Sequence, residues 1–323
     1  MVKDYIMNFT VAIPTYNGEL TLPLVLERLQ KQVNPENIAW EVIVIDNNSH
    51  DNTSQVVKDF ATNWPVHVPL KYFFEQKQGM AYARWRAIKE AQGEFVGFLD
   101  DDNLAAPDWV YQSYLFGREH QKVGAYGGEI QGYFQTPPPD NFEPAKTFLA
   151  IRKYADTATL FEVAKLRLPP GAGLVVRKQA WLESVPSRVT HTQRGCEDYE
   201  ISINMHLAGW EIWYNPQMQI QHLIPAWRMQ KSYLVSIARI YGLSTCQIRL
   251  MTVKADWQKV LLLVKIFLGG LKRIISHLLK YRNQVLTNLG LACEMSFFIG
   301  QLFSPFYYLK QRFYAINLTR NIN

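Results

Sequence analysis

The sequence predicts an α/β protein with a mostly parallel sheet between flanking helices, followed by a helical C-terminal extension. Short apolar runs alternate with helical patterns over the first 105 residues, and polar residues follow the ends of those runs. The extension is predicted by charge. Residues 226–323 carry 14 Lys and Arg against 2 Asp and Glu (+12), whereas the rest of the chain carries 20 against 26 (−6).

The elements of the first half follow in strict alternation. Short runs rich in β-branched and aromatic residues predict buried strands, and apolar residues at helical spacing predict the helices between them. The expected strands are 8–14, 40–45, 70–74 and 95–99, and the expected helices are 20–33, 53–63 and 79–92. Since ligands of such sheets bind outside the carboxyl ends of the strands, we expect the site at that edge.

The fourth strand runs directly into three consecutive carboxylates, Asp100, Asp101 and Asp102. Like charges this close raise one another's pKa unless a cation intervenes. Carboxylate oxygens suit Mg²⁺ or Mn²⁺, which are often shared with substrate phosphates. A divalent cation site is therefore predicted here, with a solvated acidic turn as the alternative.

Composition excludes several other classes. The three cysteines are widely spaced and form no C-x-x-C pair, so neither a zinc site nor a disulfide framework is indicated. No G-x-G-x-x-G or P-loop pattern follows the first strand. Residues 1–10 lack a long apolar run, so a secretory signal is not predicted and a cytoplasmic location is expected. A basic character confined to one apolar third favours an anionic membrane surface over nucleic acid.

The next hundred residues continue the domain. A helix over 107–120, an extended segment over 123–134 and a Gly-rich turn at 168–173 are expected. Glu197 and Asp198 open a helical pattern, where acids are favoured by the helix dipole. A closing strand follows and includes His222.

The extension contains three expected helices, over 227–250, 257–280 and 289–309. On a helical wheel the second is apolar on one side and basic on the other, which is typical of a helix lying in a membrane interface. The alternative is a helix that covers the catalytic core. The third is long enough to span, but Gly300 and Pro305 are expected to interrupt it, and the carboxylate of Glu294 is costly in a bilayer. An interfacial or partly inserted helix is therefore favoured.

Four motifs in order resemble the family 2 (GT-A fold) inverting glycosyltransferases over about the first 110 residues. They are Val11-Ala12-Ile13-Pro14-Thr15-Tyr16-Asn17, Val44-Ile45-Asp46-Asn47-Asn48-Ser49, Ala83-Arg84 ahead of Ala91-Gln92-Gly93, and Phe98-Leu99-Asp100-Asp101-Asp102. The resemblance implies a GT-A, Rossmann-like fold that binds a nucleotide-sugar donor and a divalent metal.

The resemblance also implies roles for the donor site. Pro14, Tyr16 and Asn17 belong to its first motif. Asp46 resembles the aspartate that accepts from uracil, although it could also cap the following helix. Arg84 resembles the arginine that reaches the ribose or diphosphate, and Trp85 stands where the family usually has Asn.

The metal and catalytic residues follow in the same way. Asp102 is the first choice for the metal ligand, and Asp100 is a further candidate ligand. Asp100 or Asp101 would otherwise serve the ribose or a water beyond the metal's direct ligands. His222 would complete the metal site or bind diphosphate, with a structural histidine as the alternative. Asp198 matches the general base, and Glu197 is the alternative base or orients it.

We therefore predict a catalytic domain over 1–225, with a nucleotide-binding half (1–105) and an acceptor-binding half (106–225), and a membrane-surface extension over 226–323. The predicted activity is that of a metal-dependent hexosyltransferase. It moves a sugar from a UDP-linked donor to a polysaccharide or lipid-linked glycan at the cytoplasmic face. Two alternatives stay open from the sequence: a nucleotidyltransferase of similar fold, and a non-catalytic glycan-binding protein.

Overall fold

The computed structural model describes residues 7–33, 38–187 and 197–320. Within them the chain forms two compact units. The first comprises 7–133, 151–187 and 197–224, and the second comprises 134–150 and 225–320. The second unit thus takes in a loop segment from the middle of the chain as well as the C-terminal helices.

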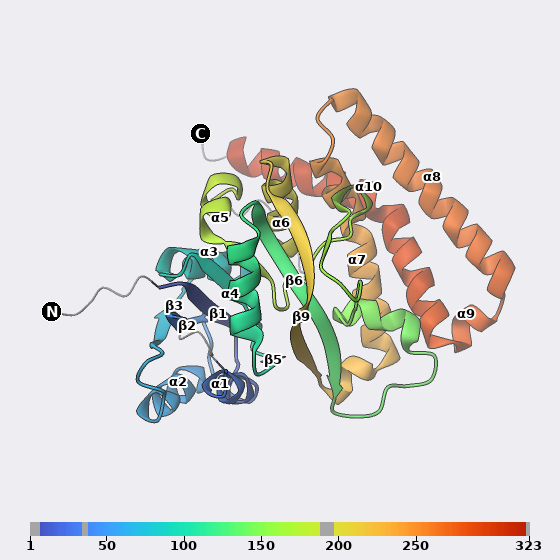
Figure 1. Ribbon diagram of the computed structural model, residues 1–323. Coiled ribbons are helices and arrows are strands. Elements are labelled where there is room, and N and C mark those ends of the chain that lie inside the picture. Colours follow the sequence, from blue (N-terminus) through green and yellow to red (C-terminus); the bar gives the residue numbers. More distant parts are fainter. Residues whose placement is uncertain (1–6, 34–37, 188–196, 321–323) are drawn as a thin grey trace. The chain divides into compact units, whose positions relative to one another are not determined.

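The first unit is built on one mixed sheet (Figure 1). Its strand order is β3-β2-β1-β4-β8-β6-β9-β5, and β7 pairs with β9. The strands are β1 (Phe9–Thr15), β2 (Trp40–Asp46), β3 (Leu70–Phe74), β4 (Phe95–Phe98), β5 (Asn103–Ala105), β6 (Val123–Phe134), β7 (Thr159–Leu160), β8 (Val175–Arg177) and β9 (Glu211–Ile224). The first four pair in parallel, as predicted, whereas the pairings of β8 with β4 and β6, and of β9 with β5 and β7, are antiparallel.

Helices connect the parallel strands, which confirms the predicted α/β class. The connecting helices are α1 (Leu22–Gln30), α2 (Thr53–Thr62) and α3 (Met80–Glu90). Three more helices of the unit follow β5, namely α4 (Trp109–Glu119), α5 (Lys178–Ser184) and α6 (Glu197–Leu207). Strands β1 and β2 are buried along their whole length, because helices cover the sheet and no face of these strands meets water. The short elements β5, β7 and α5 were not predicted.

Close packing fixes the strand that carries the acidic run. An added Cβ at Gly97 would lie 2.6 Å from the Trp109 ring of α4 and 2.8 Å from the Phe9 ring of β1. Only glycine leaves room there, so the helix that follows the acids packs directly on β4. Leu99 N–H donates to Ala12 O over 3.0 Å, which holds the end of β4 beside β1.

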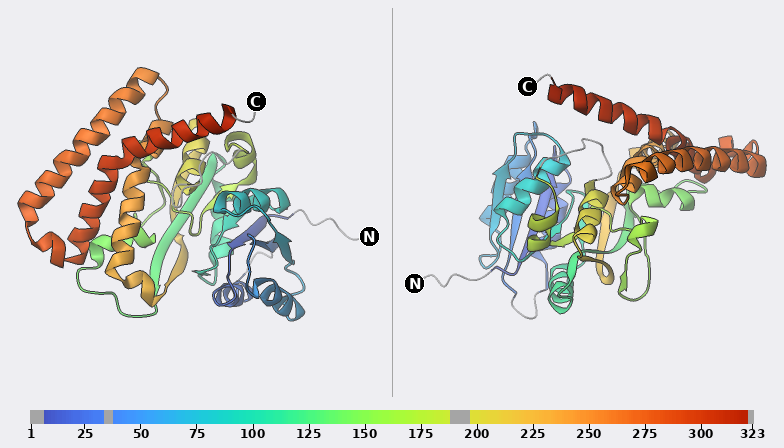
Figure 2. Two further views of the ribbon diagram at one scale, coloured as in Figure 1. Left: turned by 180° about the vertical axis from the view of Figure 1, so that it is seen from behind. Right: turned by 90° about the horizontal axis from the view of Figure 1, so that it is seen from above.

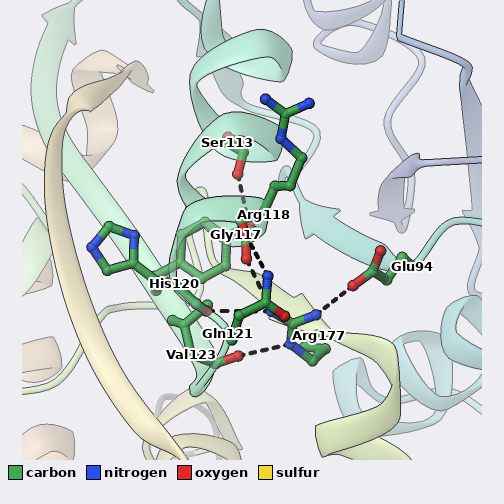
Figure 3. A network of polar contacts seen from close by, with 9 residues as sticks. Glu94, Ser113, Gly117, Arg118, His120, Gln121, Val123 and Arg177 are labelled. Atoms are coloured by element: carbon green, nitrogen blue, oxygen red, sulfur yellow. Dashed lines mark hydrogen bonds and ion pairs between the residues drawn. The ribbon is translucent and has the colours of Figure 1, made fainter.

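A buried arginine ties the opposite end of β4 to its surroundings (Figure 3). The Arg177 guanidinium pairs with Glu94 and donates to the carbonyls of Gly117 (2.9 Å), His120 (3.3 Å) and Val123 (3.2 Å). The carbonyls of Gly117 and His120 lie at the C-terminal end of α4, where backbone carbonyls have no N–H partner within the helix. One side chain therefore joins β4, β8, α4 and β6.

The second unit is helical. It contains two 3₁₀ turns and four α-helices: η1 (Glu143–Leu149), η3 (Ala226–Met229), α7 (Lys231–Met251), α8 (Asp256–Tyr281), α9 (Gln284–Thr287) and α10 (Leu289–Arg320). Helix α10 runs between α7 and α8 (Figure 2). Gly242 of α7 and Gly300 of α10 let the two backbones approach, since a Cβ on either would lie 2.9 Å from the other's Cα.

Helix α10 is continuous through Gly300 and Pro305, so the expected interruption at these residues is wrong. Pro305 cannot donate the backbone hydrogen bond that the carbonyl of Gln301 would accept. The Ser304 hydroxyl donates to that carbonyl instead, over 2.8 Å. The substitute donor explains why the helix tolerates proline.

Among the described residues, Leu289–Phe313 of α10 is the one helical segment long and apolar enough to cross a membrane, by length and composition alone. Half of its apolar window is buried within the protein. The same helix therefore provides much of the core of the second unit.

Candidate functional site

The carboxyl ends of β1, β2 and β4 meet at one edge of the sheet. In the register of β1 and β2, Thr15 lies opposite Asp46. The Thr15 hydroxyl donates to Asp101 Oδ2 over 2.5 Å, which links the end of β1 to the acidic run. The structure therefore brings the first, second and fourth motifs together.

Asp46 is buried with both carboxylate oxygens engaged. Oδ1 accepts from Ser49 N–H (2.9 Å), and Oδ2 accepts from the Tyr72 hydroxyl (2.6 Å). Burial, followed by this bond, raises the pKa of Tyr72. Helix α2 begins after Asn52, so the alternative in which Asp46 caps that helix is wrong, and Asp46 closes the preceding turn instead.

The loop after β1 lies beside this turn. Asn17 has a left-handed backbone (φ 56°), and its side-chain oxygen accepts from His50 N–H over 2.9 Å. Tyr16 is 45% exposed, and its ring meets the His50 ring edge-on at 6.3 Å. Pro14 is buried within β1. Tyr16 and His50 thus offer accessible aromatic surface close to Asp46, whereas Pro14 shapes the strand.

The three acids of the run point to different partners. Asp101 accepts from Thr15 and from the Tyr16 N–H, and burial raises its pKa to about 7 although the Thr15 bond lowers it. Asp102 accepts from the Asn103 amide at Oδ1 (2.9 Å), and its Oδ2 lies 3.3 Å from His222 Nε2. Asp101 is therefore a link to the β1 loop, while Asp102 faces the closing strand.

Asp100 is the least compensated of the three. It is partly buried, and the loss of hydration raises its pKa. Its Oδ1 is buried and has no hydrogen-bond partner among the described residues. The charges that act on it are those of Arg84, Asp102, His222 and Asp198. Charged residues from four separate sequence segments therefore act on one partly buried carboxylate.

His222 reaches this position because β5 pairs with β9. The register sets Asn103 opposite His222, and Leu223 N–H donates to Asp102 O over 2.8 Å. The sequence does not indicate this pairing, because β5 is only three residues long and shows no alternation.

Arg84 and Asp198 meet at the Gly-rich turn. The Gly171 N–H donates to Asp198 Oδ2 over 2.7 Å, and a Cβ at Gly171 would lie 2.2 Å from Arg84 Nη2. Arg84 is buried, with its guanidinium carbon 5.7 Å from the centre of the Phe98 ring. Glycine at 171 therefore leaves room for the guanidinium beside the candidate base.

Glu197 is the first residue of α6 and is partly buried beside Asp198. The segment before it, 188–196, lies outside the described residues. Trp85, which replaces the usual Asn, packs against Trp181 of α5 with 5.6 Å between the ring centroids, and its Nε1 donates to Pro186 O. Trp85 thus serves the packing of α3 on α5.

The donor set suits a cation that the substrate helps to hold. Within 7–33, 38–187 and 197–320, no group of three or more His, Cys, Asp and Glu is placed to bind a metal alone. The predicted ligands Asp102, Asp100 and His222 are thus not a preformed three-ligand centre. Mg²⁺ in nucleotide enzymes takes one or two carboxylates plus substrate phosphates. The unpaired oxygen of Asp100 beside Asp102 fits that arrangement.

Sequence reasoning missed three residues that shape the site. Thr15 lies inside the first motif, where its hydroxyl was the available signal. Asn103 accepts from the Asp100 N–H (3.1 Å) and donates to Asp102, and its place directly after the acids was the clue. Tyr72 carries no comparable signal, since an aromatic residue in a strand is expected for packing alone.

Comparisons with known proteins concern the family and the fold of the chain. The sequence pattern of Glycosyl transferase family 2 matches residues 10–172. A poly(ribitol-phosphate) beta-N-acetylglucosaminyltransferase, TarS of Staphylococcus aureus (strain Mu50 / ATCC 700699), is 32% identical over 114 residues, which is 35% of this chain and 19% of TarS. A second relative is WfgD of Escherichia coli, a UDP-Glc:alpha-D-GlcNAc-diphosphoundecaprenol beta-1,3-glucosyltransferase. It is 33% identical over 103 residues, which is 32% of this chain and 37% of WfgD. The matches therefore span well under half of these relatives.

Solved structures show the same fold. TarS residues 1–349 in complex with UDP-GlcNAc align with TM-score 0.55 at 20% identity, covering 80% of this chain and 70% of that one. The mannosyltransferase PcManGT from Pyrobaculum calidifontis, in complex with GDP-Man and Mn²⁺, aligns with TM-score 0.56 at 18% identity, covering 93% and 88%. The family pattern covers half of the chain, and the fold it implies is the one observed. This chain belongs to glycosyl transferase family 2.

Proposed function

We propose that this protein transfers a hexose from a UDP-linked donor to a glycan acceptor by a single inverting displacement. The proposal rests mainly on the electrostatic environment of the Asp100 carboxylate. One carboxylate, with a buried oxygen that has no hydrogen-bond partner among the described residues, lies within the electrostatic influence of Arg84, Asp102, His222 and Asp198. A diphosphate held with its cation would satisfy both the acids and the arginine.

The donor would lie along the edge of the sheet. Tyr16 and Asp46 are proposed to hold the uracil, with Asn17 and Pro14 shaping that end. Asp100 and Asp102 would hold a divalent cation together with the diphosphate, and His222 supports Asp102 over 3.3 Å. When bound, that cation neutralises charge on the leaving group. Asp101 keeps the acidic run attached to the β1 loop.

Asp198 is proposed as the general base. Its Oδ2 is oriented by the Gly171 N–H, and the Arg84 guanidinium lies against the same glycine. The acceptor hydroxyl attacks the anomeric carbon as its proton passes to Asp198, and the bond from that carbon to the diphosphate oxygen breaks. Arg84 stabilises the negative charge that the diphosphate gains. Glu197 is the alternative base.

The acceptor is proposed from the relatives. One of them glycosylates poly(ribitol-phosphate), and another acts on a diphosphoundecaprenol-linked sugar, as their names state. Both acceptors carry phosphate groups, as the names state. We accordingly propose a polysaccharide or lipid-linked acceptor, a catalytic domain over 1–225, and a peripheral position at the cytoplasmic membrane face through 226–323.

The decisive variant is Asp198→Asn. It should abolish transfer, with a loss of at least about 10²-fold in kcat, while UDP binding stays within about twofold of the wild type. Glu197→Gln is the matched control and should retain more activity. An Asp198→Asn enzyme that turns over normally would remove the base assignment. Consumption of UTP with release of pyrophosphate would instead favour a nucleotidyltransferase.

A further inference from the structure

Helix α8 is apolar on two opposite sides. Counted at about 100° per residue, one side faces α7 and α10, and the other faces away from them. The outward side carries nine apolar residues, between 40% and 74% exposed: Trp257, Val260, Leu261, Val264, Leu268, Leu271, Ile275, Leu278 and Leu279. These residues fall within an arc of about 100°.

The inward side accounts for residues that do not fit a simple amphipathic helix. Ile266, Gly270 and His277 lie on or near the basic side of the wheel, yet all three are buried. A Cβ at Gly270 would lie 2.9 Å from the Cα of Leu302, and His277 Nε2 lies 3.1 Å from Leu291 O. The polar side of the helix therefore supplies part of the contact with α10.

Because packing uses that side, the outward apolar residues have no role in the core of the unit. A stripe of this length exceeds the scattered apolar residues that are normal on a soluble surface. Such a stripe marks a surface for another apolar partner.

The charge of the helix distinguishes between possible partners. Asp256 is its single acid, against five Lys and Arg. Exposed Lys265 and Lys272 lie seven residues apart along one border of the apolar stripe. Near one end the stripe carries Trp257, and at the other the Lys280 ammonium lies 4.8 Å from the centre of the Tyr281 ring. Aromatic and basic residues at the borders of an apolar face are typical of interfacial helices.

We propose that the outward face of α8 docks on an anionic lipid bilayer, with its apolar stripe in the interface and Lys265 and Lys272 at the headgroups. A second copy of this chain fits less well, since it would bring another +12 region against the first. The proposal deepens the peripheral membrane position in the proposed function. It also stands apart from sugar transfer, because docking needs no substrate.

The test is cosedimentation of the full chain with phosphatidylcholine vesicles, with or without phosphatidylglycerol. The wild type should bind vesicles with phosphatidylglycerol roughly tenfold more tightly than those without. Leu268→Gln with Ile275→Gln should lower binding to both by roughly tenfold or more. Lys265→Gln with Lys272→Gln should lower only the binding that depends on phosphatidylglycerol, by roughly tenfold.

The matched control is Leu182→Gln with Leu207→Gln, two leucines of similar exposure in the first unit. This pair should bind vesicles like the wild type. A second readout concerns contact itself: brominated lipid should quench part of the tryptophan fluorescence, and Trp257→Phe should remove that part.

Two results would overturn the proposal. One is equal vesicle binding by the α8 variants and the control pair. The other is a wild type that ignores vesicles but forms a dimer in sedimentation velocity, with Leu268→Gln and Ile275→Gln dissociating it. The second result would assign the face to another copy of the chain. Hydrolysis of the UDP-sugar, measured without lipid, should be the same in all variants, which separates failure here from failure of the proposed function.

Discussion

Strand β4 has a charged centre at each end, and the two centres differ in how their charges are compensated. At the start of the strand, Arg177 donates to three carbonyls and pairs with Glu94. At its end, three acids meet, and Asp100 Oδ1 has no hydrogen-bond partner among the described residues. Burying a charge costs free energy unless its partners replace water. The first centre contains its partners, whereas the second would obtain them from a ligand.

The comparison separates stability from function within one strand. At the Arg177 centre the charges are paired within the protein, so this centre stabilises the fold and is not expected to bind a ligand. A centre of like charges destabilises the fold and gains its partners when a cation and a diphosphate arrive. The following changes test that contrast, in order of decreasing effect.

The largest effect is expected at the ligand end. Asp102→Asn removes the charge that faces His222, and kcat/KM should fall by about 10²- to 10³-fold. Thermal unfolding should hardly change, because Asn can still accept from Asn103 and occupy the same volume. Initial rates with a UDP-sugar and differential scanning calorimetry check the two parts. A large loss of stability with this variant would contradict the division of roles.

The opposite pattern is expected at the other end. Arg177→Met leaves the carbonyls of Gly117, His120 and Val123 without their donor and should destabilise the protein by about 3 kcal/mol. Urea unfolding of the variant measures the change. Arg177→Lys is the control and should recover only part of the loss, because an ammonium lacks the guanidinium fork. The folded fraction of Arg177→Met should keep its kcat.

Asp100→Asn should change stability and activity in opposite directions. Burial raises the pKa of Asp100, so the folded state disfavours the carboxylate that the unfolded chain holds freely. A neutral amide removes that penalty, and the melting temperature should rise by roughly 2–4 °C, as for a gain of about 1 kcal/mol. Activity should fall in the same variant. A lower melting temperature would show that Asp100 is already compensated without ligand.

The smallest effect is expected at Tyr72, which lies outside both centres and supports Asp46. Tyr72→Phe removes the hydrogen bond to Asp46 Oδ2. UDP affinity should fall by roughly fivefold, the equivalent of about 1 kcal/mol, with kcat at saturating donor unchanged. Binding titrations with UDP and GDP measure the affinity and its selectivity. An equal loss of affinity for UDP and GDP would argue against a role of Tyr72 in recognising the uracil.

The contrast also explains which features could be predicted from sequence. Asp46 and the acidic run were identifiable because they follow apolar strands, and parallel strands bring their carboxyl ends together. The division of labour within the run was not identifiable. It depends on Thr15 turning Asp101 toward β1 and on the β5–β9 register turning Asp102 toward His222. Both are long-range contacts that leave no periodic signal in the chain.

In the C-terminal helices, too, positions could be predicted from sequence but long-range contacts could not. Their positions were predicted from apolar spacing, and the structure confirms helices there. The packed side of α8 was not predictable from the sequence. It depends on the contacts of Gly270 with Leu302 and of His277 with Leu291 of α10. Glycines that permit close helix approach are indistinguishable in sequence from helix-weakening ones.

Calorimetric titration of UDP shows directly whether a cation and a diphosphate complete the acidic end of β4. The titration is run with Mn²⁺ and again with EDTA, for the wild type and Asp102→Asn. We expect the wild type to lose at least about tenfold in UDP affinity without Mn²⁺, and Asp102→Asn to show the weak affinity in both conditions. Equal UDP affinity of the wild type with Mn²⁺ and with EDTA would contradict this expectation.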